Sequence, residues 1–286
     1  MNTASFPHDI TEIAILAGKG DYPLQLAQSA RAQGVKTIFV IAFRHETDRA
    51  ITRYADEVQW LYLGQFGAVR DALQSRGIKV AVMAGQITPT HLFSLRFDKF
   101  TLELLSRLKH RNAHTIYGTA CDELKAVGVE LLPACLFMEN AMPEAGLIGG
   151  RPPTEFEMAD IRFGLDVAKI TSGIDIGQTV VVKDGTILAV EAYEGTDETI
   201  LRAGRLVKGG GAIVVKVAKK GHDMRFDIPI VGMRTLKTLR KSKTAVLAVE
   251  AKRTILLDRA KLIAEANRLG LCLMAMNTED SVTGAS

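Results

Sequence analysis

The chain has 286 residues, of which 47% are hydrophobic and 24% are charged, and its formal net charge is +4. This balance is typical of a folded protein with one large core or two domains, and the charge is too small to indicate nucleic acid as a partner. The three cysteines form no C-x-x-C pair, which excludes a disulfide framework and a thiolate zinc site and suits a reducing cytosol. No signal peptide or membrane-spanning apolar run is found, so we expect a cytoplasmic protein.

The first half of the chain alternates predicted strands with predicted helices. Strands are expected over residues 12–17, 36–42, 57–63 and 80–84, with helices over 22–33 and 66–76. Glycines close both helices, and Asp21 with Pro23 suits the start of the first one. Such alternation predicts parallel βαβ units, so we expect an α/β protein with a Rossmann-like parallel-sheet domain over residues 1–137.

The second half follows a different pattern. Prolines and glycines are dense over residues 138–157, which predicts a linker. Asp184-Gly185 then predicts a tight type I′ hairpin. Further strands are expected over 212–217, 245–250, 254–257 and 271–276, and helices over 158–171, 196–206 and 258–268. We therefore expect a distinct, catalytic mixed α/β domain over residues 158–286.

Two glycine turns follow predicted strands at one edge of the first sheet. Gly18-Lys19-Gly20 opens a helix, where backbone N–H groups suit a phosphate, and Gly85-Gln86 ends another strand at the same edge. The dinucleotide fingerprint would require a third glycine where this chain has Pro23, and an acid at the end of the second strand. The residues thus argue against NAD, and a turn that serves only the fold explains them equally well.

Other motifs give weaker signals. His110 and His114 have helical i, i+4 spacing but lack the glutamate of the metalloprotease pattern, so surface histidines are the plainer interpretation. No G-x-S-x-G elbow and no Walker loop occurs. The apolar stretch Leu92–Leu108 contains Arg96, Lys99 and Arg107, which fits a core helix with a solvated basic edge, or an acyl-chain groove or membrane-facing surface.

Two acidic motifs lie in a strongly basic segment of the second half. They are Glu194-Gly195-Thr196-Asp197 and the stretch from Arg225 to Gly232, which contains Asp227. Isolated carboxylates in cationic surroundings suit a phosphate-bearing substrate with its divalent cation. The surrounding cations are Arg202, Arg205, Lys208, Lys216, Lys219, Lys220, Arg234, Lys237, Arg240, Lys241 and Lys243.

Asp227 is the sharpest of these candidates. Pro229 interrupts regular strand pairing two residues later, so the carboxylate is expected near a strand end. Arg225 and Arg234 favour its ionised form, ready to bind a cation or orient water. A surface salt bridge explains Asp227 as well, and an N-terminal helix cap explains Thr196 as well.

These motifs resemble the LpxI-type UDP-2,3-diacylglucosamine pyrophosphatases of Gram-negative lipid A biosynthesis. The resemblance covers most of the chain, and its second-half motifs are the more specific. The chain departs from the family pattern at Lys19, where another glycine is frequent, and at Gln86, where asparagine is usual. The matching motifs are Leu16–Gly20 with Pro23, Ala84-Gly85, Met158–Asp160, Asp175–Gln178, Ala189–Ala192, Glu194–Asp197, Lys216–Lys219 and Arg225–Pro229.

The resemblance implies an Mg²⁺-dependent hydrolase with an N-terminal Rossmann-like domain and a distinct C-terminal domain. Water would attack the α-phosphorus and release UMP and 2,3-diacylglucosamine 1-phosphate. The functional aspartate of the family falls on Asp227, and Lys216 is a candidate phosphate clamp. Asp227 would hold the metal ion or accept the proton of water, and Asp197 and Glu194 are our candidates for further metal ligands, because Mg²⁺ prefers one or two carboxylates plus phosphate oxygens. The substrate-binding residues would be Gly18, Lys19, Gly20, Gly85, Gln86, Thr196, Lys216 and Arg225.

The resemblance also implies a glycolipid nucleotide as substrate, a homodimer, and peripheral contact with the cytoplasmic face of the inner membrane. No nucleic acid is expected as a partner. Two alternatives stay open from the residues alone. One is a non-catalytic protein that binds a nucleotide sugar or lipid, and the less favoured one is a nicotinamide-dependent oxidoreductase.

Overall fold

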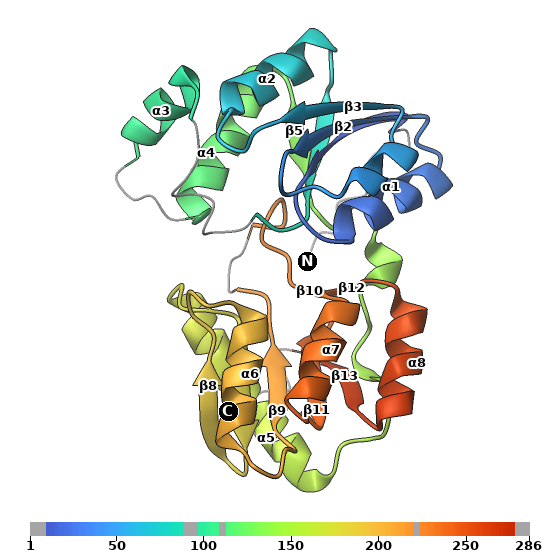
Figure 1. Ribbon diagram of the computed structural model, residues 1–286, viewed down its shortest axis with the longest axis vertical. Coiled ribbons are helices and arrows are strands. Elements are labelled where there is room, and N and C mark those ends of the chain that lie inside the picture. The colour runs from blue at the N-terminus through green and yellow to red at the C-terminus, as the bar shows by residue number, and fades with distance from the viewer. Residues whose placement is uncertain (1–9, 88–96, 109–112, 220–222, 278–286) are drawn as a thin grey trace. The chain divides into compact units, whose positions relative to one another are not determined.

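The computed structural model describes residues 10–87, 97–108, 113–219 and 223–277 (Figure 1). The chain forms two compact units. The first unit runs to Phe137 and also takes in Met224–Phe226, and the second unit contains the remainder from Met138 onward. The fold is therefore α/β, as the sequence predicted, with one large sheet in each unit and a further two-stranded sheet.

The first unit contains a five-stranded parallel sheet in the order β3-β2-β1-β4-β5. This order matches the first five strands of the doubly wound Rossmann order 3-2-1-4-5-6 and confirms the predicted class. Helices α2 and α4 pack on one face through residues such as Leu73 and Leu124, and α1 packs against β1 and β4. The elements are β1 (Glu12–Ala17), α1 (Tyr22–Ala32), β2 (Thr37–Phe43), η1 (Arg49–Arg53), β3 (Glu57–Leu61), α2 (Phe66–Ser75), β4 (Val80–Ala84), α3 (Lys99–Ser106), α4 (Ala113–Ala126) and β5 (Glu130–Leu132).

The second unit contains a six-stranded mixed sheet in the order β6-β13-β11-β9-β7-β8. Its middle strands β9, β11 and β13 are parallel, and β6, β7 and β8 pair antiparallel. The type I′ hairpin is confirmed, because Asp184 and Gly185 both have positive φ, of 48° and 72°. The strands are β6 (Gly146–Gly149), β7 (Thr179–Lys183), β8 (Thr186–Val190), β9 (Ile213–Lys216), β11 (Val246–Glu250) and β13 (Cys272–Met276), and a separate pair is formed by β10 (Ile230–Val231) and β12 (Ile255–Leu256).

The stretch 138–157, which the sequence suggests is a linker, belongs to the second unit and is partly ordered into secondary structure. It contains the short 3₁₀ helix η3 (Glu139–Ala141), strand β6 and the start of α5. Strand β6 pairs with β13 and so covers what would otherwise be an open edge of the sheet. Proline and glycine content marked the turns of this stretch but did not reveal the pairing, because an edge strand of four residues carries little pattern of its own.

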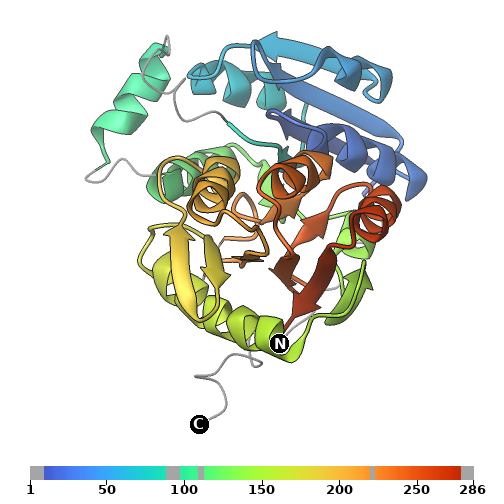
Figure 2. The same ribbon diagram turned by 60° about the horizontal axis from the view of Figure 1, so that its bottom comes forward.

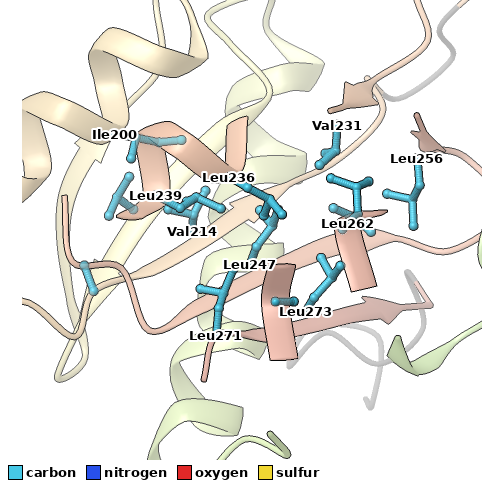
Figure 3. Packing of buried hydrophobic residues seen from close by; sticks show 14 of the residues in the cluster. Ile200, Val214, Val231, Leu236, Leu239, Leu247, Leu256, Leu262, Leu271 and Leu273 are labelled. Atoms are coloured by element: carbon cyan, nitrogen blue, oxygen red, sulfur yellow. The ribbon is translucent and has the colours of Figure 1, made fainter. Parts of the chain in front are cut away.

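Helices cover both faces of the second sheet (Figure 2). Helices α6 (Thr196–Leu206), α7 (Met233–Lys241) and α8 (Arg259–Leu269) lie side by side on one face, and α5 (Glu155–Gly173) covers the other. Alternating strand residues serve the two faces: Leu247 packs with α6–α8 (Figure 3), whereas Val246 packs with α5. Both faces are apolar, as expected of strands buried on both sides.

Helix α5 begins with a capping box. Thr154 Oγ1 accepts from Glu157 N at 3.2 Å, and Glu157 Oε2 accepts from Thr154 N at 2.8 Å. Arg151 adds two charge-assisted hydrogen bonds to the same carboxylate, at 2.7 and 2.5 Å. The Arg151 contacts, followed by those from Thr154, lower the pKa of Glu157 to about 2.

Within the described ranges, no helix combines the length and apolarity needed to cross a membrane.

Glu157→Gln should lower the free energy of unfolding of the second unit by about 1 kcal/mol at neutral pH, because it removes the negative charge that pairs with Arg151, whereas the glutamine oxygen can still accept from Thr154 N. Because the pKa of Glu157 is depressed to about 2, the carboxylate stabilises the fold above its unfolded-state pKa and less as pH falls toward 2. Urea unfolding followed by circular dichroism at several pH values should therefore show the wild-type advantage shrinking with acidification. Glu155→Gln, a change in the same helical turn, serves as control and should shift stability by less than about 0.5 kcal/mol.

Candidate functional site

The Arg225–Pro229 motif crosses from one unit to the other. Met224–Phe226 belongs to the first unit, where the Phe226 ring centroid lies 5.4 Å from that of Tyr117 and Met224 O accepts from Ala134 N at 2.6 Å. Asp227 belongs to the second unit, and its N–H donates to Asp223 O at 2.9 Å. The turn around Arg225 thus places this arginine and Asp227, predicted as neighbours in one site, in different compact units.

Lys216 is a buried cation at the end of β9. Its side chain is on the face covered by α6–α8, and the residue is 8% exposed. Among the described residues, Nζ donates one hydrogen bond, to Thr196 Oγ1 at 3.1 Å. Burial lowers the pKa of the Lys216 ammonium, and the carboxylates of Glu191, Asp197 and Asp227 raise it in opposition. The structure therefore brings Asp197, Asp227, Thr196 and Lys216, all named from the sequence, around one ammonium group.

Glu191 is a further member of this group that sequence reasoning missed. It follows β8, is 8% exposed, and its Oε1 accepts from Thr196 Oγ1 at 2.9 Å. Its Oε2 is buried without a hydrogen-bond partner among the described residues. Thr179 completes the polar cluster, with its Oγ1 3.2 Å from Thr196 Oγ1. Strand alternation was the available signal, since Glu191 continues the buried face that Ala189 begins.

Gly177 is required beside Glu191 for steric reasons. A Cβ at this glycine would lie 2.1 Å from the Glu191 carbonyl oxygen, a distance that backbone atoms cannot tolerate. The loop between α5 and β7 therefore packs directly on the backbone of Glu191 and limits its movement. This contact explains why the motif Asp175–Gln178 contains a glycine at position 177.

Asp197 and Glu194, two of the three predicted metal ligands, each form an ion pair with an arginine. Asp197 pairs with Arg234, Nε to Oδ2, at 2.6 Å, and accepts from Thr238 Oγ1 at 3.1 Å. Glu194 accepts from Arg202 at 2.7 Å and from Ala192 N at 3.3 Å. Its own backbone N–H, followed by Arg202, holds the pKa of Glu194 below its usual range.

The predicted ligand set Asp227, Asp197 and Glu194 does not form a ready metal site. In the part of the chain that the structure describes, no group of three or more His, Cys, Asp or Glu side chains is placed to hold a metal ion. Glu194 stabilises its own turn through Ala192 and Arg202 instead. Asp197 and Asp227 remain close enough to Lys216 to influence its pKa, and their oxygens are of the type that Mg²⁺ prefers.

The cluster around Lys216 lies where the parallel strands of the second sheet end. Open α/β sheets bind ligands at this edge, and the N-terminal turns of α6 and α7 contribute Thr196 and Arg234 to it. An ammonium has three donors, and Thr196 accepts from one of them. The arrangement can therefore bind an anionic oxygen through Lys216 while carboxylates nearby accept protons or hold a cation.

The two glycine turns of the first unit interlock. Gly18 N donates to Ala84 O at 2.7 Å, and Lys19 and Gln86 exchange backbone hydrogen bonds of 2.7 and 3.0 Å. A Cβ on Gly18 would lie 2.7 Å from Gln86 O, and one on Gly85 would lie 2.8 Å from Lys19 O. Packing thus accounts for both glycines. Two of the N–H groups suggested for a phosphate, those of Gly18 and Lys19, already donate hydrogen bonds to backbone carbonyls. Substrate contacts remain a prediction for Gly18, Lys19, Gly20, Gly85 and Gln86.

Two sequence candidates fall partly outside the described residues. His110 is not described, and of His114 only the helical backbone is. The stretch Leu92–Leu108 is described from residue 97 onward, where α3 buries Leu104 and leaves Leu102 54% exposed.

Gly85→Ala should destabilise the first unit by about 3 kcal/mol or more, because φ is +95° and the new methyl group would meet backbone atoms of Lys19. Gly34→Ala is the matched control: φ is +101°, but nothing lies within 4 Å. It should cost about 1–2 kcal/mol. Equal losses in denaturant unfolding would contradict the interlocking of the two turns.

Lys216→Met should cost about 1 kcal/mol or less, because the change relieves the desolvation of an ammonium that has one hydrogen bond. Lys169→Met should cost about 3 kcal/mol, because Lys169 Nζ lies 2.6 Å from Glu250 Oε2 and the Glu250 side chain is 2% exposed. Urea unfolding of both variants compares a buried lysine that donates to a hydroxyl with one that is paired with a buried carboxylate. A larger loss at Lys216 than at Lys169 would contradict it.

Known proteins were compared with this chain. The LpxI N-terminal domain family matches residues 12–141, and the LpxI C-terminal domain family matches residues 144–274. The UDP-2,3-diacylglucosamine pyrophosphatase LpxI of Caulobacter vibrioides is 30% identical over 281 residues, covering 94% of this chain and 99% of that protein.

The chain is distantly similar to two solved structures. The biotin carboxylase subunit of pyruvate carboxylase has a TM-score of 0.27 and 11% identity, and the match covers 68% of this chain and 41% of that structure. N5-carboxyaminoimidazole synthetase from Staphylococcus aureus with ADP has a TM-score of 0.24 and 15% identity, with coverage of 62% and 38%. These values carry no argument about function. The two domain families and the full-length relative together establish that the chain belongs to the LpxI family.

Proposed function

We propose that the chain is a diphosphatase that hydrolyses UDP-2,3-diacylglucosamine to UMP and 2,3-diacylglucosamine 1-phosphate in lipid A biosynthesis. The relative from Caulobacter vibrioides that carries this activity in its name matches almost the full length of both chains. The observation in the structure that supports the proposal best is Lys216, a buried cation that donates one hydrogen bond within the described residues and whose pKa is raised by three carboxylates. Hydrolysis of a pyrophosphate diester needs a cation to offset the negative charge of the phosphates, because that charge disfavours the approach of a lone pair of water. It also needs a carboxylate to accept the proton of water.

The residues of the second unit suit the parts of this reaction. Lys216 would donate to a pyrophosphate oxygen and offset its charge, with Thr196 and Glu191 fixing its direction. Asp227 would accept a proton from water as the water oxygen bonds to the α-phosphorus. The bond from that phosphorus to the bridging oxygen breaks, so UMP carries the new oxygen and the lipid phosphate leaves.

Magnesium is part of the proposal. When bound, it would neutralise pyrophosphate charge, and Asp227 and Asp197 are the carboxylates that would hold it alongside substrate oxygens. Arg202 and the Ala192 N–H occupy the carboxylate of Glu194, and Arg234 and Thr238 occupy that of Asp197, so metal binding by either residue would require these contacts to be exchanged. The donor chemistry of the two aspartates fits a hard cation of this kind.

The cellular setting follows from the same proposal. A cytoplasmic enzyme with a glycolipid nucleotide substrate would make peripheral contact with the inner membrane, and a homodimer remains a prediction from the family resemblance. The alternative of a non-catalytic protein that binds a nucleotide sugar or lipid requires the same ligand but no turnover. A nicotinamide-dependent oxidoreductase is the weaker alternative, because the fingerprint residues are absent from the sequence.

Asp227→Asn should lower the rate of UMP release by about 100-fold or more, the usual contribution of a positioned acid–base group. Reaction in ¹⁸O-labelled water should place the label in UMP, and EDTA should abolish release until Mg²⁺ is restored. Asp184→Asn is the control: it removes a carboxylate from the hairpin at the opposite end of β7, where asparagine also suits the turn. Near wild-type release by Asp227→Asn would overturn the assignment, and binding without UMP release by the wild type would favour the non-catalytic alternative.

A further inference from the structure

The three helices on one face of the second sheet carry most of the positive charge of the protein. Together α6, α7 and α8 contain nine basic and three acidic residues, a net charge of +6, whereas the whole chain carries +4. Helix α5, on the opposite face of the same sheet, contains four acidic and two basic residues, a net charge of −2. The positive charge is therefore concentrated on one side of the second unit, where α6, α7 and α8 lie side by side (Figure 2).

Helical spacing turns these cations toward solvent. On α7, Arg234, Lys237 and Lys241 recur at i, i+3 and i+7 and are exposed, whereas Leu236 and Leu239 are buried on the other side of the helix. All nine basic residues of the three helices are exposed. We call these side chains, with Lys208 and Lys243 from the loops after α6 and α7, the cationic surface. Most of the cations that surround the acidic motifs in the sequence thus face outward, whereas Lys216 is buried.

Ion pairs neutralise only part of the cationic surface. Four of its cations pair with a carboxylate, and the side chain of each of the four is still at least 44% exposed. Within the described ranges, Arg205, Lys208, Lys237, Lys241 and Lys243 form no ion pair. Uncompensated charge of one sign over neighbouring helices creates a positive potential that attracts an anionic partner.

The helix dipole explains some of these cations but not the whole surface. Basic residues in the last turn stabilise the C-terminus of a helix, and Arg205, Arg240, Lys241 and Arg268 occupy such positions. Lys237 lies in the middle of α7, beyond the reach of this effect. The loop lysines also lie outside the helices, so the fold by itself does not require the full set.

The composition of the surface favours a lipid membrane as its partner. Leu206 is 63% exposed at the end of α6, directly after Arg205 and two residues before Lys208. An apolar side chain between cations is typical of surfaces that lie on anionic lipid, where the apolar group enters the headgroup region. The three helices contain no aromatic residue on which the bases of a single-stranded nucleic acid would stack.

We propose that the cationic surface binds a membrane that contains anionic phospholipids, with Arg205, Lys237 and Lys241 toward the headgroups and Leu206 toward the acyl boundary. The choice of a lipid partner rests in part on the proposed function, because acyl chains anchor that substrate in a membrane. The surface itself is argued from the second unit alone.

Sedimentation of the full chain with vesicles measures this binding in the absence of substrate. The protein should bind vesicles of phosphatidylcholine mixed with phosphatidylglycerol but not vesicles of phosphatidylcholine alone, and added salt should weaken binding by screening the charges. Lys237→Gln combined with Lys241→Gln should weaken binding about 25-fold, because each cation near an anionic surface contributes about fivefold. Thermal melts check that the second unit remains folded.

Lys36→Gln combined with Lys79→Gln is the matched control, because it removes the same charge from exposed positions of the first unit. This variant should bind vesicles as the wild type does. Equal losses in the two double variants, equal binding to neutral and anionic vesicles, or tighter binding to double-stranded DNA than to anionic vesicles at the same salt would each overturn the proposal.

The proposed function and the membrane surface can fail separately. Release of UMP from detergent-dispersed substrate by a protein that does not bind anionic vesicles would remove the membrane surface and leave the proposed function. Vesicle binding that depends on Lys237 and Lys241, without UMP release, would do the reverse.

Discussion

The burial of the Lys216 ammonium is the constraint on which the second unit's site depends. Desolvation disfavours its charge, and the fold offsets this with one hydrogen bond from Lys216 to Thr196 and the field of Glu191, Asp197 and Asp227. A methionine would fill the same space with less difficulty. Proteins accept such a local cost in stability where a ligand completes the contacts, which is why we propose that the cluster binds substrate.

Strand alternation and helix placement create that environment together. The α6–α8 face of the second sheet is apolar along most of its length and becomes polar at the carboxyl ends of the parallel strands. The first turns of α6 and α7 meet there, where Arg234 of one helix pairs with Asp197 of the other. In the first unit, polar residues also gather at the carboxyl edge of the sheet. The turn after β2 is hydrogen-bonded to the end of β1 and lines a pocket together with Trp60 and Tyr62.

The acidic motifs illustrate how far residue patterns reach toward a site. Glu194 and Asp197 look like metal ligands in the sequence, yet each carboxylate is paired with an arginine, and Arg234 is 37 positions away from Asp197 in the chain. Glu191 was not selected from the sequence, because it directly follows an ordinary strand. In the structure its carboxylate is buried and accepts a hydrogen bond from Thr196. The role of a buried polar side chain depends on the groups that surround it in space. It can therefore be assigned only once those groups are known.

The sequence by itself determined the elements and their classes: the alternation of strands and helices, the Asp184-Gly185 hairpin and the family. These depend on local periodicity, turn chemistry and motif spacing, all of which are written along the chain. Only the tertiary structure decided the pairing of β6, the interlocked glycines, the surroundings of Lys216 and the pocket beside Trp60. Each of these depends on contacts between residues far apart in sequence, whose distances no local pattern encodes.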